Sequence, residues 1–202
     1  MDMGPFLPVV YDIDGSDRIV RVNDAWSATA EEGEAPGLRA PQVLGRSLWD
    51  FVEDQTTRQL YVAMLERART GTRPLSFAFR CDTPTLRRLM QMRITGLGGG
   101  AVSFEVRLIA AQPRPRVALL EPSLPREGFV RMCSWCKRLP LPTGEWVEIE
   151  AAMKVLDILD TVPLPAISHG MCPQCYRAVV DRLDRDPRAG ENDVTLGPLP
   201  GP

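Results

Sequence analysis

Alternating apolar and polar positions in the first half of the chain predict a β-sheet. In the segment LSFAFRCD, Leu75, Phe77, Phe79 and Cys81 alternate with polar or small residues, and LMQMRI and VSFEVRLI repeat this period of two. In a strand, this period places every second side chain on one face. We therefore expect three strands that each bury one face. The remaining inward side chains would be Met90, Met92, Ile94, Val102, Phe104, Val106 and Leu108.

The segments before these strands predict two further strands and two helices. LPVVYDIDGSDRIVRVND has two short apolar runs around a turn at residues 14–16, which is typical of paired strands. A short helix is expected near Asp24, with Asn23 or Asp24 as its cap. A longer helix is expected to end at Gly71, and its apolar face would carry Leu60, Met64, Leu65 and Ala68. The order predicts an α+β fold, in which one antiparallel five-stranded sheet has helices on one side.

Proline divides the chain into two predicted parts. Residues 113–128 contain Pro113, Pro115, Pro122 and Pro125. Prolines at this density disfavour a continuous helix or a central strand, so the segment is predicted to be a semi-rigid linker. It would join a domain at residues 1–112, which we expect to fold by itself, to a cysteine-rich module at residues 129–185. The tail, residues 186–202, is rich in Gly, Pro and charge and is expected to be disordered.

The module at residues 129–185 carries four of the chain's 5 cysteines and its 1 histidine. Cys133 with Cys136 and Cys172 with Cys175 form two Cys-x-x-Cys pairs, which together supply the four ligands of a tetrahedral Zn²⁺ site. The gap between the pairs is longer than the usual spacing of about 15–20 residues. Within it, Ile149, Ala152, Met153 and Leu156 recur at helical spacing, and PQCYRAVVDRLD predicts a second helix after Cys172. So small a module has a thin core, and a metal would supply the missing folding free energy.

His169 leaves three interpretations open. It could replace one cysteine as a metal ligand, donate its N–H to a bound thiolate, or have a purely structural role. Zinc is the first expectation for four thiolates, and a single iron ion or an iron–sulfur cluster shares the same ligand type. The basic side chains expected to offset the charge of the thiolates are Arg131, Lys137, Arg138 and Arg177.

Charge and composition exclude several function classes. The net charge is −2, and there is no basic stripe of the kind that binds nucleic acid. No apolar run approaches the roughly 18 residues of a membrane span, and the N-terminus lacks a secretion signal, so we expect a cytoplasmic protein. No catalytic combination of residues stands out, and we expect no enzyme activity. Glu148 and Glu150 are interpreted as the solvated start of a helix, and Arg80 with Asp82 as a local ion pair.

The first part of the chain resembles a PAS domain. The residues that carry the resemblance are DIDGSDRIVRVNDAW at 12–26, VLGRSLWDFV at 43–52 and the three alternating strands. PAS domains serve as ligand pockets, dimerisation surfaces or both. No histidine precedes His169 to ligate haem, Cys81 is interpreted as a small buried apolar residue rather than a haem ligand, and the flavin-linked string NCRFLQ is absent. We therefore expect neither haem nor flavin.

The cysteine-rich module has a resemblance of its own. CSWCKR, GEWVEIE and SHGMCPQC resemble a cysteine-rich element of bacterial signalling proteins that carry PAS, receiver or kinase domains. Together the two resemblances imply a non-enzymatic bacterial sensory or adaptor protein, in which a zinc-stabilised module contacts a signalling partner. The alternative is a redox or metal sensor, in which oxidation within either cysteine pair releases zinc and unfolds the module.

A homodimer is the second partner that the resemblance to PAS domains implies. PAS domains often associate through the sheet and the N-terminal flank. Here the flank carries Phe6, Leu7, Val9 and Val10, which would be unfavourable solvent-facing residues in a monomer. Alternatively, these residues cover the core of their own domain.

Overall fold

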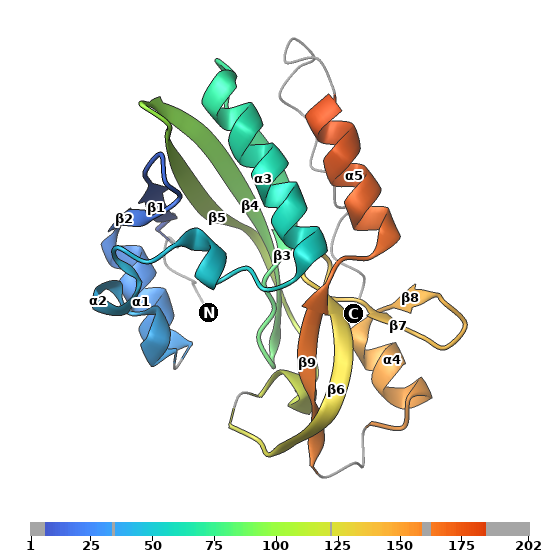
Figure 1. Cartoon of the computed structure of the whole chain (residues 1–202). Coiled ribbons are helices and arrows are strands. Elements are labelled where there is room, and N and C mark those ends of the chain that lie inside the picture. The colour runs from blue at the N-terminus through green and yellow to red at the C-terminus, as the bar shows by residue number, and fades with distance from the viewer. Residues whose placement is uncertain (1–6, 34, 122, 159–162, 185–202) are drawn as a thin grey trace.

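The protein is built around one five-stranded antiparallel sheet (Figure 1). The computed structural model describes residues 7–33, 35–121, 123–158 and 163–184. The strands lie in the order β2-β1-β5-β4-β3, and they are β1 (Val9–Ile13), β2 (Ile19–Val22), β3 (Leu75–Arg80), β4 (Leu86–Gly98) and β5 (Ala101–Pro113). This arrangement confirms the predicted α+β fold with one antiparallel five-stranded sheet.

The register of the strands places the predicted apolar residues on one face. Phe77 lies opposite Met92, and Ile94 lies opposite both Leu75 and Phe104. Phe77, Ile94 and Phe104 are completely buried. The face predicted from the alternation therefore forms the inner face of the sheet and the main core.

Helices cover this inner face. They are α1 (Asp24–Glu32), α2 (Ala40–Val43) and α3 (Gln55–Thr70), with two 3-10 turns, η1 (Pro36–Leu38) and η2 (Leu48–Asp50). The predicted cap Asn23 accepts a hydrogen bond from the backbone N–H of Trp26, and Asp54 caps α3 in the same way through Thr57. All four side chains predicted for the apolar face of α3 are buried, so α3 is held by packing on the sheet.

The predicted linker begins inside the sheet, because β5 continues to Pro113. The next residue, Arg114, is buried, and η3 (Ala118–Leu120) inserts a completely buried Leu119 into a second apolar cluster. This second cluster belongs mainly to the cysteine-rich module. Packing thus continues across the predicted boundary, and the separate folding of residues 1–112 stays a prediction.

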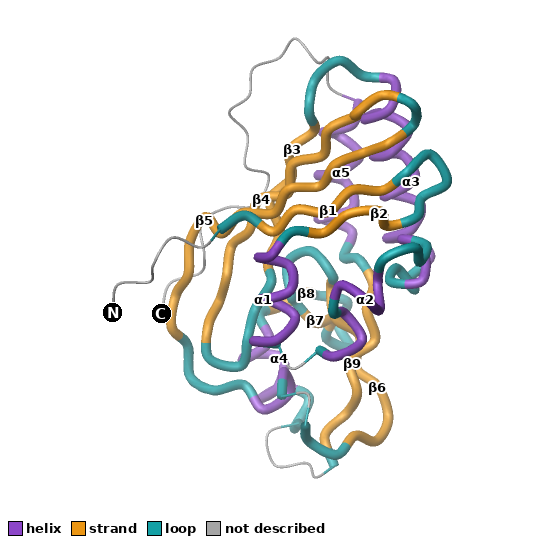
Figure 2. Tube along the Cα trace, turned by 90° about the vertical axis from the view of Figure 1, so that its left-hand side faces the viewer, coloured by secondary structure: helices purple, strands orange, loops and turns teal. Residues whose placement is uncertain are grey.

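The cysteine-rich module contains both predicted helices, α4 (Ile149–Val155) and α5 (Pro173–Asp184). It also contains four strands that the sequence pattern did not predict. β6 (Arg126–Cys133) pairs in parallel with β9 (Leu164–Gly170), and β7 (Leu139–Pro140) forms a short antiparallel pair with β8 (Trp146–Val147). Figure 2 shows α3 and α5 together on one side of the main sheet.

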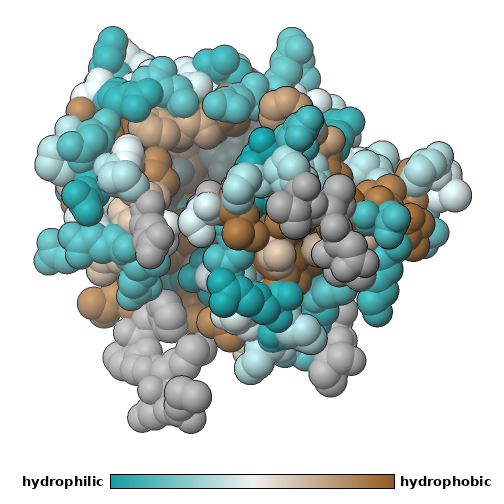
Figure 3. All heavy atoms as spheres, turned by 90° about the horizontal axis from the view of Figure 1, so that it is seen from below, coloured by the Kyte–Doolittle hydropathy of each residue, from teal (hydrophilic) through white to brown (hydrophobic). Residues whose placement is uncertain are grey.

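The surface gives mixed evidence on association. Leu7 is 71% exposed, whereas Val9 lies opposite Val106 on the inner face of the sheet; Phe6 and the tail at residues 186–202 lie outside the described residues. Seen from below, the molecule has a hollow rimmed by apolar side chains (Figure 3). In the part of the chain that is described, no helix has the length and apolar character needed to cross a membrane.

Candidate metal centre

Four cysteines from two distant segments meet in the core. Their sulfur atoms all lie within 4.8 Å of one another, and all four residues, Cys133, Cys136, Cys172 and Cys175, are buried. The first pair begins at the end of β6 and continues into the turn that follows it, while the second pair lies at the start of α5. The parallel pairing of β6 with β9 brings the two pairs together, because each pair follows one of these strands closely.

The spacing of the sulfur atoms fits a metal better than a disulfide. The Sγ atoms of Cys136 and Cys172 are 3.8 Å apart, well beyond the ~2.05 Å of a disulfide bond. A tetrahedron with metal–sulfur bonds of about 2.3 Å has edges of about 3.8 Å. Backbone N–H groups also point at the sulfurs: Cys172 donates to Cys133 Sγ and Cys175 to Cys172 Sγ, each at 3.4 Å. Such donors stabilise thiolates, so the donor set suits a thiolate-bound metal ion.

The acidity of the four thiols is strongly interdependent. Hydrogen bonds with the other three thiols, Cys136 first, lower the pKa of Cys133, whereas hydrogen bonds with the other three, Cys133 first, raise the pKa of Cys175. The pKa of Cys136 is also raised, chiefly by Cys133. Four thiolates cannot share this buried space without a cation, because their negative charges repel each other. A bound metal ion would remove that conflict.

His169, the predicted alternative ligand, does not belong to the group of residues placed to hold a metal ion. It lies in β9 opposite Met132, and its residue is exposed. Among the predicted basic neighbours, Lys137 donates from Nζ to the carbonyl oxygen of Ser134 at 2.9 Å, and burial lowers its pKa. Arg138 instead pairs with Glu148 at 3.1 Å. Lys137 is thus tied to the first cysteine turn, while Arg138 links that turn to the start of α4.

Trp135, inside the first cysteine pair, joins the metal centre to the main sheet. Its side chain is 4% exposed and packs against three aromatic rings, with centroid distances of 6.5 Å to Tyr61, 6.2 Å to Phe77 and 6.1 Å to Phe79. The backbone N–H of Arg80, at the free edge of β3, donates to the carbonyl oxygen of Trp135 at 2.7 Å. Sequence reasoning missed this role, although an aromatic residue between two ligand cysteines was the available signal.

Buried ion pairs also hold the cysteine-rich module against the sheet, near the end of β3. The predicted ion pair between Arg80 and Asp82 is confirmed, and Asp82 also binds Arg114 at 2.7 Å, with both side chains 0% exposed. Arg80 Nη1 reaches Glu148 at 2.6 Å. Opposite charges that are buried in this way hold each other in place, because removing either one leaves the other buried and unpaired.

The expectation that Glu148 and Glu150 are simply solvated was wrong. Their side chains are only 22% and 25% exposed. Glu150 pairs with Arg87 at 2.6 Å and with Arg114 at 3.2 Å. No local periodicity predicts that these two arginines, from the start of β4 and the end of β5, lie beside the start of α4. The two carboxylates therefore belong to the contact between module and sheet.

Cys81, the fifth cysteine, lies apart from the four-sulfur group. It is partly exposed, and its Sγ accepts a contact from Arg88 Nη2 at 3.4 Å. Arg88 Nε also donates to the carbonyl oxygen of Cys81 at 2.6 Å. Its role here is thus to help hold an arginine in position at the end of the sheet.

Comparison with known proteins adds little to this description. No family model matches the chain. No curated protein matches it either. Among solved structures, the chain is similar to a sensory box sensor histidine kinase from Vibrio cholerae, with a TM-score of 0.37 and 9% sequence identity over 52% of this chain and 83% of that one.

Proposed function

We propose that the protein is a non-enzymatic sensory or adaptor protein in which a zinc ion fixes the cysteine-rich module against a PAS-like sensor sheet. The observation that carries this proposal is the convergence of four buried cysteine sulfurs beside Trp135, whose side chain packs into the inner face of that sheet. In this function, the PAS-like part receives a ligand or partner, and the module passes the change on through protein contacts, without nucleic acid or membrane.

The residues that would hold the ion are Cys133, Cys136, Cys172 and Cys175. A zinc ion in a closed four-thiolate site supplies folding free energy rather than a reactive position. The chain itself supplies the remaining parts: backbone N–H groups orient the sulfurs, Lys137 provides a nearby positive charge, and Trp135 transmits the position of the first cysteine turn to β3.

The same observations favour a structural over a redox role for the cysteines. Reactive thiolates are partly exposed, whereas these four residues are at most 6% exposed. We therefore expect the metal-loaded thiolates to resist millimolar peroxide. Rapid zinc release under peroxide would instead support the alternative, a thiol-based redox sensor.

Metal content measured on purified protein tests the proposal. We expect about one zinc per chain and little iron, and Cys133→Ser should lose the zinc because three thiolates bind it far more weakly. Cys81→Ser is the matched control, since Cys81 lies outside the four-sulfur group and should leave zinc content unchanged. Full zinc content in the Cys133 variant, or iron in place of zinc in the wild type, would contradict the proposed centre.

Association is the second measurable part of the proposal. If the PAS-like part forms a homodimer through its N-terminal flank, light scattering should report a dimer that becomes monomeric when residues 1–7 are deleted. A protein that is monomeric at all accessible concentrations and binds no signalling partner would contradict the adaptor function.

A further inference from the structure

A cavity of about 480 Å³ lies between the inner face of the sheet and the helices at its N-terminal side. Its size is within the range of about 300–1,000 Å³ that is typical of small-molecule sites. The sheet lines the cavity with apolar side chains, which include Val9, Leu86 and Leu108. The opposite wall comes from α1 and η1 and includes Trp26, Ala30 and Leu38. The walls are therefore largely apolar and belong to the PAS-like part of the chain.

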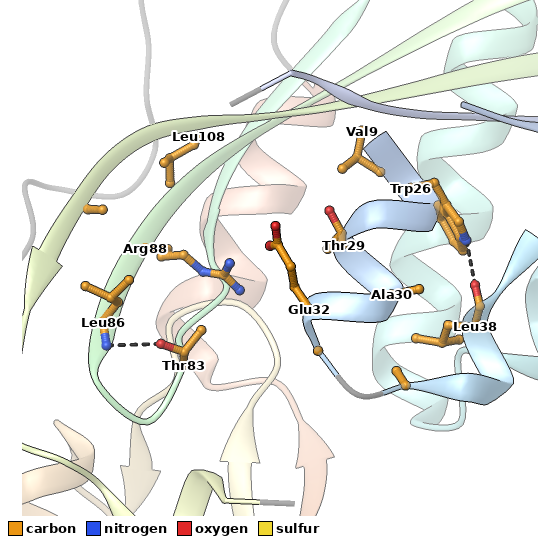
Figure 4. A pocket seen from close by; sticks show the side chains of 13 residues that line it. Val9, Trp26, Thr29, Ala30, Glu32, Leu38, Thr83, Leu86, Arg88 and Leu108 are labelled. Atoms are coloured by element: carbon orange, nitrogen blue, oxygen red, sulfur yellow. Dashed lines mark hydrogen bonds between the residues drawn. The ribbon is translucent and has the colours of Figure 1, made fainter. Parts of the chain in front are cut away.

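Two opposite charges face each other across this apolar space. Figure 4 shows the guanidinium group of Arg88 and the carboxylate of Glu32 pointing into the cavity from opposite walls. Among the described residues, no ion pair joins them, and neither has another ion-pair partner. The cavity thus offers one cationic and one anionic contact that the protein does not itself neutralise.

Arg88 is held in a fixed position for such a contact. Its Nε donates to the carbonyl oxygen of Cys81 at 2.6 Å, and its Nη2 contacts Cys81 Sγ at 3.4 Å. Its Nη1 makes no hydrogen bond to the described part of the chain. An arginine that is positioned in this way loses little conformational freedom when it binds a carboxylate.

Glu32 is an exposed residue that lines the cavity, and its place in α1 favours a nearby cation. It is the last residue of α1, whose final turn contains no basic residue. The carbonyl end of a helix carries partial negative charge, so a carboxylate there is destabilising unless a positive group lies nearby. Because Arg88 on the opposite wall does not pair with it, a positively charged group in the cavity would relieve this repulsion.

We propose that the cavity binds a small zwitterion with an apolar body, of which an α-amino acid with a large apolar side chain is the simplest kind. The carboxylate of the ligand would face Arg88, its ammonium group would face Glu32, and its apolar body would lie against Trp26 and the sheet. The inference rests on the proposed function, because it names the class of ligand that the PAS-like part receives.

Calorimetric titration of the full-length, zinc-loaded chain tests the proposal. The probes are L-phenylalanine and L-leucine, together with 3-phenylpropionate, which lacks the ammonium group, and 2-phenylethylamine, which lacks the carboxylate. We expect an amino acid to bind about tenfold or more tightly than either phenyl analogue, the size expected for losing one charged hydrogen bond. No binding of either amino acid, or equal binding of phenylalanine and 3-phenylpropionate, would overturn the proposal.

Charge-removing variants identify which residue recognises which group. Glu32→Gln should weaken phenylalanine binding about tenfold without weakening that of 3-phenylpropionate. Arg88→Met should weaken phenylalanine binding without weakening that of 2-phenylethylamine. Glu31→Gln and Arg93→Met are the matched controls, because they remove the same charges and neither residue lines the cavity. Equal losses in the controls, or no loss in the cavity variants, would contradict the assignment.

Zinc content measured on the same samples separates this inference from the proposed function. Zinc-loaded protein that binds no probe would overturn the zwitterion site alone. Protein that binds the amino acid but contains no zinc would support the cavity and contradict the metal centre. Circular dichroism of each variant confirms that a lost heat signal does not arise from unfolding.

Discussion

Replacing Trp135 with alanine tests whether the cysteine-rich module and the sheet form one core. The side chain is almost completely buried among Tyr61, Phe77 and Phe79. Removing a buried tryptophan costs about 3–5 kcal/mol of the free energy of unfolding. The hydrogen bond from Arg80 to the carbonyl of residue 135 does not depend on the side chain, so the loss measures packing alone.

Urea unfolding of zinc-saturated protein measures this loss. With a urea dependence of about 1–3 kcal/mol/M, a loss of about 4 kcal/mol lowers the midpoint by about 1.3–4 M. Two probes are followed together: circular dichroism for the sheet and helices, and a zinc-binding dye for release of the ion. If the core is shared, both probes should report one coincident transition that moves to lower urea in the variant.

Phe129→Ala is the matched control, because Phe129 is an aromatic residue of the same module that is 80% exposed. We expect its effect to be within about 0.5 kcal/mol, as for other surface substitutions. The reasoning would be refuted if Trp135→Ala changed stability no more than this control. It would also be refuted if zinc release moved to lower urea while the transition of the sheet stayed where it was.

Three further predictions concern charge, protons and the domain boundary. Asp82→Asn should lower the free energy of unfolding by about 3–5 kcal/mol, because it removes the buried carboxylate charge shared by Arg80 and Arg114 and leaves Arg114 only its longer contact with Glu150. Glu105→Gln, in a pair whose arginine is 56% exposed, should cost less than about 1 kcal/mol, and equal midpoints in urea would contradict this. Zinc affinity should fall as the pH is lowered from 8 to 5. The reason is that Cys136 and Cys175, whose pKa is raised, must lose protons to bind the ion. Dialysis at each pH followed by metal analysis measures the change, and a constant affinity would contradict it. A chain ending at Gln112 should be several kcal/mol less stable than the full chain, because it exposes the aromatic rings that Trp135 covers. A urea midpoint equal to that of the full chain would instead support separate domains.

The sheet and most helices could be predicted because their signals are local. The period of two in β3, β4 and β5 reflects burial of one face, and the apolar face of α3 with its end at Gly71 reflects the same core. The two cysteine pairs were equally visible, since the ligand spacing is encoded within each turn. The structure brings the four cysteines together as that spacing predicts.

Other features depend on contacts between distant segments. β6 and β9 pair in parallel across the module. Their burial does not alternate along the strand, so neither shows the period of two that reveals a half-buried strand. The ion pairs of Glu148 with Arg80 and of Glu150 with Arg114 likewise join residues more than 30 positions apart in the chain. Two acids at the start of a predicted helix, taken alone, favour the interpretation of a solvated helix start. The cavity between Arg88 and Glu32 arises only when β4 and α1 come together.

The position of β3 places the candidate metal centre in contact with the main sheet. β3 is an edge strand, and free strand edges invite unwanted pairing unless another segment covers them. Here the first cysteine turn accepts the N–H of Arg80 at that edge, Trp135 covers the inner face and Glu148 binds Arg80 beyond it. A change in the centre that moved the turn would therefore uncover the edge, the inner face and a buried charge together. Conversely, a ligand that shifted β4 would move Arg80, because β4 pairs with β3 and Leu89 lies opposite Arg80. Coupling between the cavity and the cysteine turn would then run in both directions, as thermodynamic linkage requires.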